Sequence, residues 1–172
     1  MKNGKFYNLG LFLTKIKPIK IIIIDDVKTY FNDTMLSLAK SKGNLTFERY
    51  YKCDANLLEN LVANPRDILI VDIKGTITPD IGKDGFDIAR HAYNNTNTFV
   101  VITSAHKFHL KTRENYGDYV MPERLMTPID FNEELNIIID QYLKTKTKVY
   151  EKVIYKVGTK LVNYGIKKLP LT

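Results

Sequence analysis

Two short, mainly apolar runs, each closed by aspartate, constrain the fold of this chain more than any other feature. Ile19–Ile24 ends at Asp25 and Asp26, and Ile68–Val71 ends at Asp72. Short β-branched runs of this kind are typical of strands that are buried on both faces of a parallel sheet. Because ligands of such sheets bind beyond the carboxyl ends of the strands, we expect the three carboxylates at one site.

Three carboxylates at one place repel one another, so such a cluster either retains protons or holds a hard cation. Mg²⁺ takes oxygen ligands and keeps several of its waters, so a few side chains suffice to bind it. A single aspartate after a strand can instead cap the following helix, but that alternative accounts poorly for three converging acids. The sequence therefore predicts that Asp25, Asp26 and Asp72 form one site, which holds protons or a hard cation such as Mg²⁺.

Strand-like and helix-like segments alternate between residues 19 and 143, and this order predicts an open parallel α/β sheet. The expected strands are Ile19–Ile24, Leu45–Tyr51, Ile68–Val71, Thr98–Ile102 and a short region at Asp118–Met121. The expected helices are Lys28–Lys42, Ala55–Ala63, Phe86–Tyr93, a segment near Lys107–Asn115, and Asn132–Tyr142.

The net charge of +7 is distributed unevenly along the chain. Residues 1–20 contain five lysines and no acid, residues 144–172 contain eight lysines and one glutamate, and the segment between has 13 basic and 18 acidic residues. We therefore expect a basic N-terminal lead at 1–18, a domain at 19–143, and a basic amphipathic helical extension at 144–172. This extension would pack on its own domain or a sister chain, or bind nucleic acid or an anionic membrane.

The cellular compartment is predicted from three simple features. Cys53 is the only cysteine, so an intrachain disulfide is excluded. No apolar run reaches the ~18 residues needed to cross a bilayer. Lys15 and Lys17 interrupt the apolar segment near the N-terminus, and no cleavage site for a secretory signal follows. These features predict a cytoplasmic protein.

Five segments follow one another in an order and spacing that a known family shares. They are Asp25–Asp26, Asn64–Asp72, Gly85–Ala89, Val100–Ala105, and Pro128–Asp130 followed by Glu133–Leu135. Together they resemble the receiver domain of response regulators, in the CheY-like superfamily. The resemblance covers residues 19–143 and implies a flavodoxin-like (βα)5 fold, a three-layer sandwich whose parallel strands lie in the order 2-1-3-4-5.

The resemblance also implies a role for particular residues. Asp72 would accept a phosphoryl group from a sensor histidine kinase or a histidine phosphotransfer protein, and Thr103 would supply the switch hydroxyl. Asp25, Asp26, Asp72 and the main-chain carbonyl of Lys74 would hold Mg²⁺. A stand-alone receiver of this kind is a signalling domain in two-component phosphorelay and not an enzyme. It would contact a downstream protein, or a second copy in a homodimer, through helix 4, strand 5 and helix 5.

Three features depart from the family's pattern. The family places a lysine before the proline that opens the last helix. Here Thr127 stands at that position, or Met121 if Met121-Pro122 is aligned instead, and Arg124 is a candidate substitute cation with a different reach. The loop after the phosphoacceptor carries an insertion, Gly75–Asp84. The region of strand 5, residues 119–128, is expanded, with Tyr119 as the best match to the aromatic switch position.

Two alternative functions follow from these departures. Without the lysine, the chain could be a degenerate receiver that binds partners without being phosphorylated. The segment Asp72–Thr78 is also similar to the first motif of haloacid-dehalogenase phosphatases, Asp-x-Asp-Gly-Thr, although Lys74 stands where that family has its acid–base aspartate. Hydrolysis of a phosphomonoester would distinguish the phosphatase from the receiver.

Overall fold

The computed structural model describes residues 18–104, 116–121 and 127–145. The strands are β1 (Ile19–Ile24), β2 (Leu45–Tyr50), β3 (Ile68–Asp72), β4 (Phe99–Thr103) and β5 (Tyr119–Val120). The helices are α2 (Asp33–Lys42), α3 (Ala55–Ala63), α4 (Gly85–Asn95) and a further helix over residues 128–145, which we call helix 128–145.

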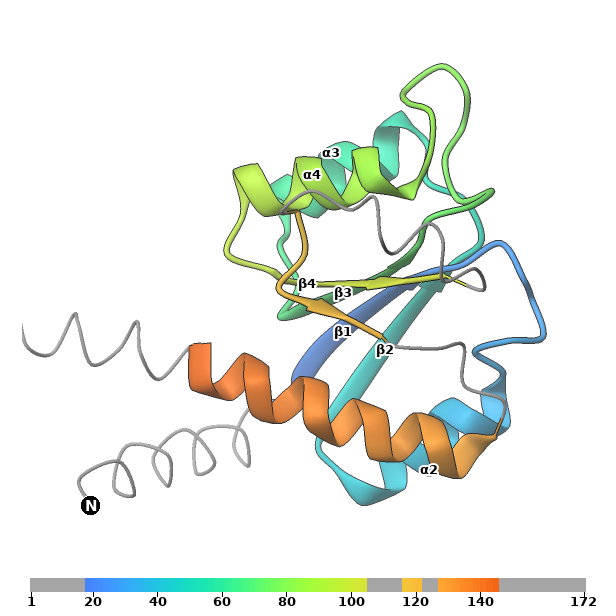
Figure 1. Cartoon of the computed structure of the whole chain (residues 1–172), viewed down its shortest axis with the longest axis vertical. Coiled ribbons are helices and arrows are strands. Elements are labelled where there is room, and N and C mark those ends of the chain that lie inside the picture. Colours follow the sequence, from blue (N-terminus) through green and yellow to red (C-terminus); the bar gives the residue numbers. More distant parts are fainter. Residues whose placement is uncertain (1–17, 105–115, 122–126, 146–172) are drawn as a thin grey trace, which may run out of the picture.

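The five strands form one parallel sheet in the order β2-β1-β3-β4-β5, as predicted. Helices α3 and α4 cover one face of the sheet, and α2 and helix 128–145 cover the other (Figure 1). The result is the three-layer flavodoxin-like arrangement. It brings the carboxyl ends of β1, β3 and β4 to the same edge of the sheet.

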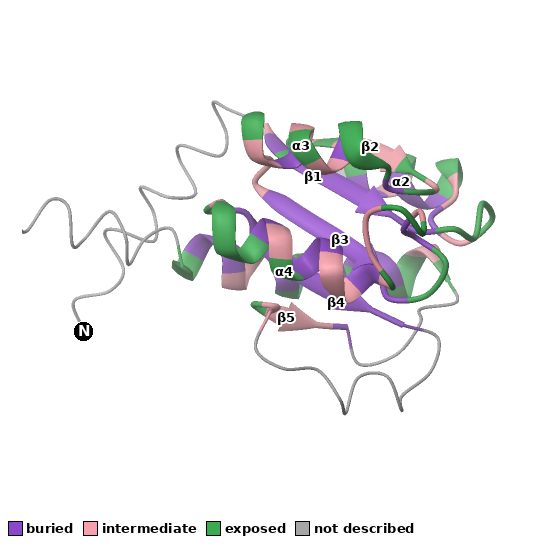
Figure 2. Cartoon of the chain, turned by 90° about the horizontal axis from the view of Figure 1, so that it is seen from above, coloured by how far each residue is buried: buried purple, intermediate pink, exposed green. Residues whose placement is uncertain are grey.

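Two apolar clusters fill the space between the sheet and its helices, one on each face. Side chains alternate along β1, so Ile21 and Ile23 join the cluster under α2 and helix 128–145, whereas Ile22 and Ile24 join the cluster under α3 and α4. Figure 2 shows the central strands buried along nearly their whole length. Each fully buried isoleucine contributes roughly 1.5–3 kcal/mol to folding, and this apolar centre holds the edge of the sheet rigidly.

The predicted start of the first described helix at Lys28 is wrong, because α2 begins at Asp33. The side chain of Asn32 accepts a hydrogen bond from the backbone N–H of Met35 and caps the helix there. The residues before it form turns, in which the N–H of Tyr30 bonds to the carbonyl of Val27. Local capping thus overrides a helical pattern of apolar residues.

The predicted last helix, Asn132–Tyr142, is too short, because the helix extends over residues 128–145. The Thr127 hydroxyl oxygen accepts a hydrogen bond from the backbone N–H of Asp130, 3.1 Å away, and caps the first turn. Pro128 then occupies the first helical position, where its missing N–H has no consequence. The ends of the other described elements differ from prediction by no more than two residues.

Several predicted features lie outside the described residues. They are the helix near 107–115, the side chain of Arg124, the lead at 1–17 and the extension from residue 146 onward. Within the described ranges, no helix has the length and apolar character needed to span a membrane.

Candidate functional site

The strand register places four residues in one row at the carboxyl edge of the sheet. The last row of residues that pairs across β1, β3, β4 and β5 contains Ile24, Val71, Ile102 and Val120. One residue further along lie Asp25, Asp72, Thr103 and Met121, of which Asp72 and Thr103 are paired directly. Since Ile70 and Val101 belong to the cluster under α2 and helix 128–145, alternation places Asp72 and Thr103 on that same face.

Three carboxylates gather at this row. Asp25, Asp26 and Asp72 each offer a carboxylate oxygen, and these oxygens lie within 4.8 Å of one another. Asp25 and Asp72 are buried, with 2% and 4% of their surfaces exposed, whereas Asp26 is exposed. The cluster therefore opens to solvent on the side of Asp26. Oxygen donors at this spacing suit a hard divalent cation.

Backbone groups orient the two buried carboxylates. Oδ1 of Asp25 accepts a hydrogen bond from the N–H of Val27 (2.8 Å), and Oδ1 of Asp72 accepts one from the N–H of Ile73 (2.9 Å). The Ile73 N–H also bonds to the carbonyl of Thr103, 3.2 Å away, which extends the pairing of β3 with β4. Each carboxylate is thus held by the first turn of the loop that follows its own strand.

Two glycines allow the loop after β3 to approach the site closely. Gly75 has a φ of +77°, and a Cβ atom on it would lie 2.1 Å from Oδ2 of Asp26. A Cβ on Gly85, at the start of α4, would lie 2.1 Å from the carbonyl oxygen of Asp72. Only glycine fits at either place, because any side chain would displace a strand end or a carboxylate. Lys74, whose carbonyl was predicted as a ligand, is exposed beside Gly75.

The hydroxyl of Thr103 is a buried polar group that lacks a hydrogen-bond partner within the described part of the chain. Thr103 is 1% exposed and is paired with Asp72 across the two strands. A buried hydroxyl left without a partner is destabilising, so such groups call for an explanation. An oxygen-rich group bound at Asp72 would supply the missing acceptor.

No cation occupies the fourth position of the row. Met121 lies one residue beyond the paired Val120, and its N–H bonds to the carbonyl of Ile102, 3.0 Å away. The Met121 side chain is completely buried in the apolar cluster under α2 and helix 128–145. Thr127, the other predicted position for the missing lysine, is exposed and caps helix 128–145. The register therefore places Met121, and not Thr127, next to Thr103.

Backbone hydrogen bonds connect the insertion Gly75–Asp84 to the segment after β2. The N–H of Cys53 bonds to the carbonyl of Thr76 (2.6 Å), and the N–H of Thr78 bonds to the carbonyl of Cys53 (3.0 Å). The Thr76 hydroxyl donates to the carbonyl of Asp72, 2.7 Å away. Burial and the neighbouring Asp54 raise the pKa of the Cys53 thiol to about 12. Sequence patterning gave no signal for this attachment, since Cys53 carries no pairing motif.

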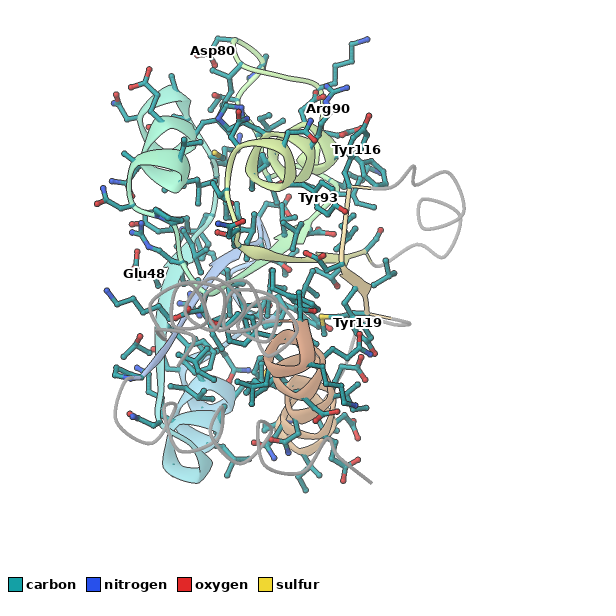
Figure 3. All side chains as sticks on the ribbon, turned by 90° about the vertical axis from the view of Figure 1, so that its left-hand side faces the viewer. Glu48, Asp80, Arg90, Tyr93, Tyr116 and Tyr119 are labelled. Carbon is teal, nitrogen blue, oxygen red and sulfur yellow. The ribbon has the colours of Figure 1, made fainter. Side chains whose placement is uncertain are left out.

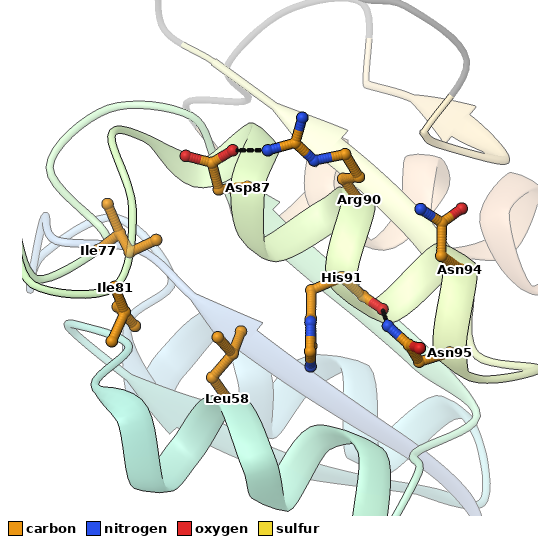
Figure 4. A pocket seen from close by; sticks show the side chains of 8 residues that line it. All are labelled: Leu58, Ile77, Ile81, Asp87, Arg90, His91, Asn94 and Asn95. Carbon is orange, nitrogen blue, oxygen red and sulfur yellow. Dashed lines mark hydrogen bonds and ion pairs between the residues drawn. The ribbon is translucent and has the colours of Figure 1, made fainter.

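The insertion also forms one wall of a groove of about 350 Å³ between α3 and α4. Figure 4 shows the apolar side chains that line the groove facing the polar side chains of α4; Leu58 comes from α3, and Ile77 and Ile81 come from the insertion. Asp87 and Arg90 form an ion pair on the rim. The groove lies on the face of the sheet that carries α3 and α4, and Asp87 is the one acid among the described residues that line it.

Tyr119, the predicted aromatic switch, is bound to helix 128–145. Its hydroxyl donates a hydrogen bond to the carboxylate of Glu134, which is buried. Burial and this hydrogen bond raise the pKa of Tyr119 to about 12. Figure 3 shows Tyr119 on the side of the sheet that carries this helix. The ring is therefore packed inward, against the apolar cluster under α2 and helix 128–145.

Comparisons by sequence and by structure give different results. No family model matches the chain. No curated protein matches it at a significant level. Solved structures match it with probability 1.00. The response regulator domain of Thermotoga maritima CheB has a TM-score of 0.56 and 14% identity, over 74% of this chain and 98% of that one. The chain has the receiver-domain fold.

Two further solved structures share this receiver fold. One is a complex of the P1 domain of CheA3 with CheY6 from R. sphaeroides, with a TM-score of 0.51 and 18% identity over 74% of this chain and 98% of that one. The other is RcsB from Salmonella enterica serovar Typhimurium bound to a promoter in the presence of the phosphomimetic BeF3⁻, with a TM-score of 0.55 and 14% identity over 86% of this chain and 98% of that one. These neighbours are signalling proteins of the receiver type, and the likeness confirms the predicted fold.

Proposed function

We propose that the chain is a stand-alone receiver in which Asp72 accepts a phosphoryl group from a phosphohistidine of a sensor kinase or a phosphotransfer protein. In this transfer a carboxylate oxygen of Asp72 attacks phosphorus, the P–N bond to histidine breaks, and an acyl phosphate forms. The observation that carries the proposal is the convergence of Asp25, Asp26 and Asp72, with oxygens within 4.8 Å, at one edge of a receiver fold.

The donor set fits Mg²⁺, since three carboxylates supply hard oxygen ligands and one side of the cluster is open to water. Asp25, Asp26 and Asp72 would hold the ion, with the main-chain carbonyl of Lys74 as a further ligand. When bound, the ion would neutralise the oxygens of the incoming phosphoryl group. The protein's own contribution is orientation, because backbone N–H groups fix one oxygen of Asp25 and one of Asp72.

Thr103 would act as the switch hydroxyl in this proposal. Its buried hydroxyl lies on the strand next to Asp72 and lacks a partner among the described residues, so a phosphoryl oxygen on Asp72 would be its acceptor. The movement that follows would change the packing of the neighbouring β5. That change would reach a downstream protein, in the cytoplasm, through the face formed by β5 and helix 128–145.

The test of this proposal is binding of beryllofluoride, a phosphoryl mimic, in the presence of Mg²⁺. The native protein should bind it and Asp72→Asn should not, whereas Asp67→Asn, at the other end of β3, should bind it normally. Labelling by acetyl phosphate should follow the same pattern. Retention of beryllofluoride by Asp72→Asn would show that the nucleophile is misassigned.

A second candidate function is supported by Met121. Because an apolar side chain fills the position next to Thr103, no lysine on β5 can pair with a phosphoryl group on Asp72. This favours a degenerate receiver that acts as an interaction module without phosphorylation. Binding of Mg²⁺ without any labelling by acetyl phosphate or kinase would support this candidate. Turnover of a phosphomonoester would instead support the phosphatase alternative, in which Lys74 replaces the acid–base aspartate.

A further inference from the structure

The outer edge of the sheet is formed by β2, and no described strand pairs with its far side. The carbonyls of Asn44 and Tyr50 accept hydrogen bonds from the backbone of β1 and of Asp25. Even-numbered residues of β2 therefore bond inward, and the peptide groups of Phe47 and Arg49 point toward the open edge. Such an edge can pair with an additional extended chain.

A groove of about 410 Å³ lies along this edge, between α2 and the odd-numbered side chains of β2. It is lined by Asp33, Leu36, Ser37, Lys40, Phe47, Arg49 and Tyr51. The side chains of an added strand alternate between the two faces of the sheet, so every second side chain would enter this groove.

Positively charged side chains in and beside the groove make cation–π contacts with its aromatic rings. Lys40 Nζ lies 6.0 Å from the ring centre of Phe47, while Lys28 Nζ and the Arg49 guanidinium carbon each lie 5.3 Å from the ring centre of Tyr51. Arg49 also donates to the Tyr51 hydroxyl (2.8 Å) and to the carbonyl of Phe31. These contacts orient the positive charges before any ligand arrives.

Little negative charge offsets these cations. Asp33 is the one acid that lines the groove; it lies 3.7 Å from Arg49, and its side chain is 93% exposed. Glu48 belongs to the opposite face of β2, where Arg66 binds both of its oxygens at 3.0 and 2.6 Å. The groove is therefore a positive strip beside an edge whose outward peptide groups have no strand partner among the described residues.

We propose that this β2 edge binds an extended acidic peptide of a partner protein, which adds as a strand beside β2 and directs alternate carboxylates to Lys40, Arg49 and Lys28. Backbone pairing would supply affinity, and the alternation of carboxylates would supply specificity. The basic ends of this chain, residues 1–20 and 144–172, are poor occupants because their charge has the same sign as the strip.

A peptide fits this edge better than a nucleic acid does. Outward-pointing N–H and C=O groups pair with another peptide backbone. Binding of single strands instead relies on aromatic rings whose faces are open to bases. Here the rings of Phe47 and Tyr51 each carry a cation of the chain itself.

The experiment titrates the full chain into a fluorescent ten-residue peptide that alternates glutamate with valine or threonine. A peptide with lysine in place of each glutamate and a ten-nucleotide oligo-dT serve as competing probes. We expect the acidic peptide to bind and to shift the backbone amide signals of Phe47 and Arg49 in NMR spectra. Tighter binding of the oligonucleotide, or amide shifts confined to other strands, would overturn the proposal.

Matched variants test the role of the cations. Lys40→Gln should weaken binding of the acidic peptide by about three- to tenfold, and Lys28→Gln should add to this loss. Lys83→Gln removes an exposed lysine of the insertion and should change affinity less than about twofold. Asp72→Asn should leave peptide affinity unchanged, which separates this proposal from the phosphoacceptor. Equal effects of Lys40→Gln and Lys83→Gln would mean that the overall charge of the chain, and not this groove, attracts the peptide, and would overturn the proposal.

Discussion

Gly75 packs so closely against Asp26 that a Cβ atom on this glycine would lie 2.1 Å from the carboxylate oxygen Oδ2. The backbone of the loop after β3 therefore fixes the position of the one exposed member of the acidic cluster. The backbone φ of Gly75, +77°, is a second reason why glycine is required here, because other residues adopt this conformation at a cost of about 1–3 kcal/mol.

Gly75→Ala should therefore lower both metal affinity and stability. We expect the dissociation constant for Mg²⁺ to rise about tenfold or more, since the added methyl group must displace Asp26. Isothermal titration and urea denaturation measure the two effects. Gly43→Ala is the matched control, because a Cβ there meets only Leu45, at 3.4 Å. Unchanged Mg²⁺ affinity in Gly75→Ala would mean that Asp26 is not a ligand.

Thr103→Val should leave stability nearly unchanged and weaken binding of beryllofluoride, because valine keeps the shape of the buried side chain and removes only the hydroxyl. The hydroxyl lacks a partner among the described residues, so its removal breaks no hydrogen bond within that part of the chain. The loss should appear only when an acceptor is bound at Asp72, and it should be about 1–2 kcal/mol. Thermal unfolding with and without beryllofluoride measures both quantities, and Thr103→Ser should behave like the native protein. A large loss of stability in unliganded Thr103→Val would contradict this role.

The sequence predicted the acidic cluster because the cluster depends on strong local patterns, whereas the sheet order followed from the resemblance of the chain to receiver domains. The apolar runs of β1 and β3 are buried as predicted, and their length fixes where Asp25 and Asp72 emerge. Helix ends were predicted less well. Asn32 and Thr127 cap helices through side-chain hydrogen bonds whose strength depends on the local backbone. The spacing of apolar residues does not predict these hydrogen bonds.

The neighbour of Thr103 could not be decided from the sequence alone. Met121 and Thr127 were both candidates, and only the pairing of β4 with β5 distinguishes them. The attachment of the insertion to Cys53 was likewise invisible, because it consists of hydrogen bonds between Cys53 and Thr76 or Thr78, which lie 23 and 25 positions away in the sequence. Contacts of this kind arise from tertiary packing and have no local signature in residue type.

Met121→Lys should destabilise the unliganded protein and partly recover when a phosphoryl mimic binds. A lysine here must bury its ammonium group among Phe131, Leu135 and their neighbours, which costs several kcal/mol. Beryllofluoride at Asp72 would offer that ammonium a counter-charge close to Thr103. We expect the ligand-induced rise in melting temperature to be larger in Met121→Lys than in Met121→Leu. Equal rises in the two variants would place residue 121 outside the reach of the phosphoacceptor.

The hydrogen bond from Tyr119 to Glu134 should make stability depend on alkaline pH. Folding raises the pKa of Tyr119 from its ordinary value of 10.0 to about 12, so folding favours the protonated form. Its contribution is fully present below pH 10 and is lost as the pH rises through 12. Cys53, whose pKa rises from 9.0 to about 12, acts in an overlapping range and in the same direction.

The measurement is therefore made in a Cys53→Ala background, by urea denaturation between pH 8 and pH 11. Tyr119→Phe should lower stability at pH 8 by about 1–3 kcal/mol, because it leaves a buried carboxylate of Glu134 without its donor. The same variant should show a flatter decline above pH 10. If Tyr119→Phe keeps the full alkaline decline, another group is responsible for it.

The reactivity of Cys53 should report opening of the insertion. The thiol is completely buried, and its raised pKa keeps it protonated near pH 8, so a thiol reagent can react only after local opening. Thr76→Val removes the hydrogen bond from the Thr76 hydroxyl to the carbonyl of Asp72, one of the contacts that hold the insertion closed. Because a buried hydrogen bond contributes about 1 kcal/mol, labelling of Cys53 should become about fivefold faster.

Thr34→Val, on the exposed surface of α2, should leave the rate unchanged. Equal labelling rates in all three proteins would mean that the opening that exposes Cys53 leaves the Thr76 hydrogen bond intact, so the insertion does not move as a unit.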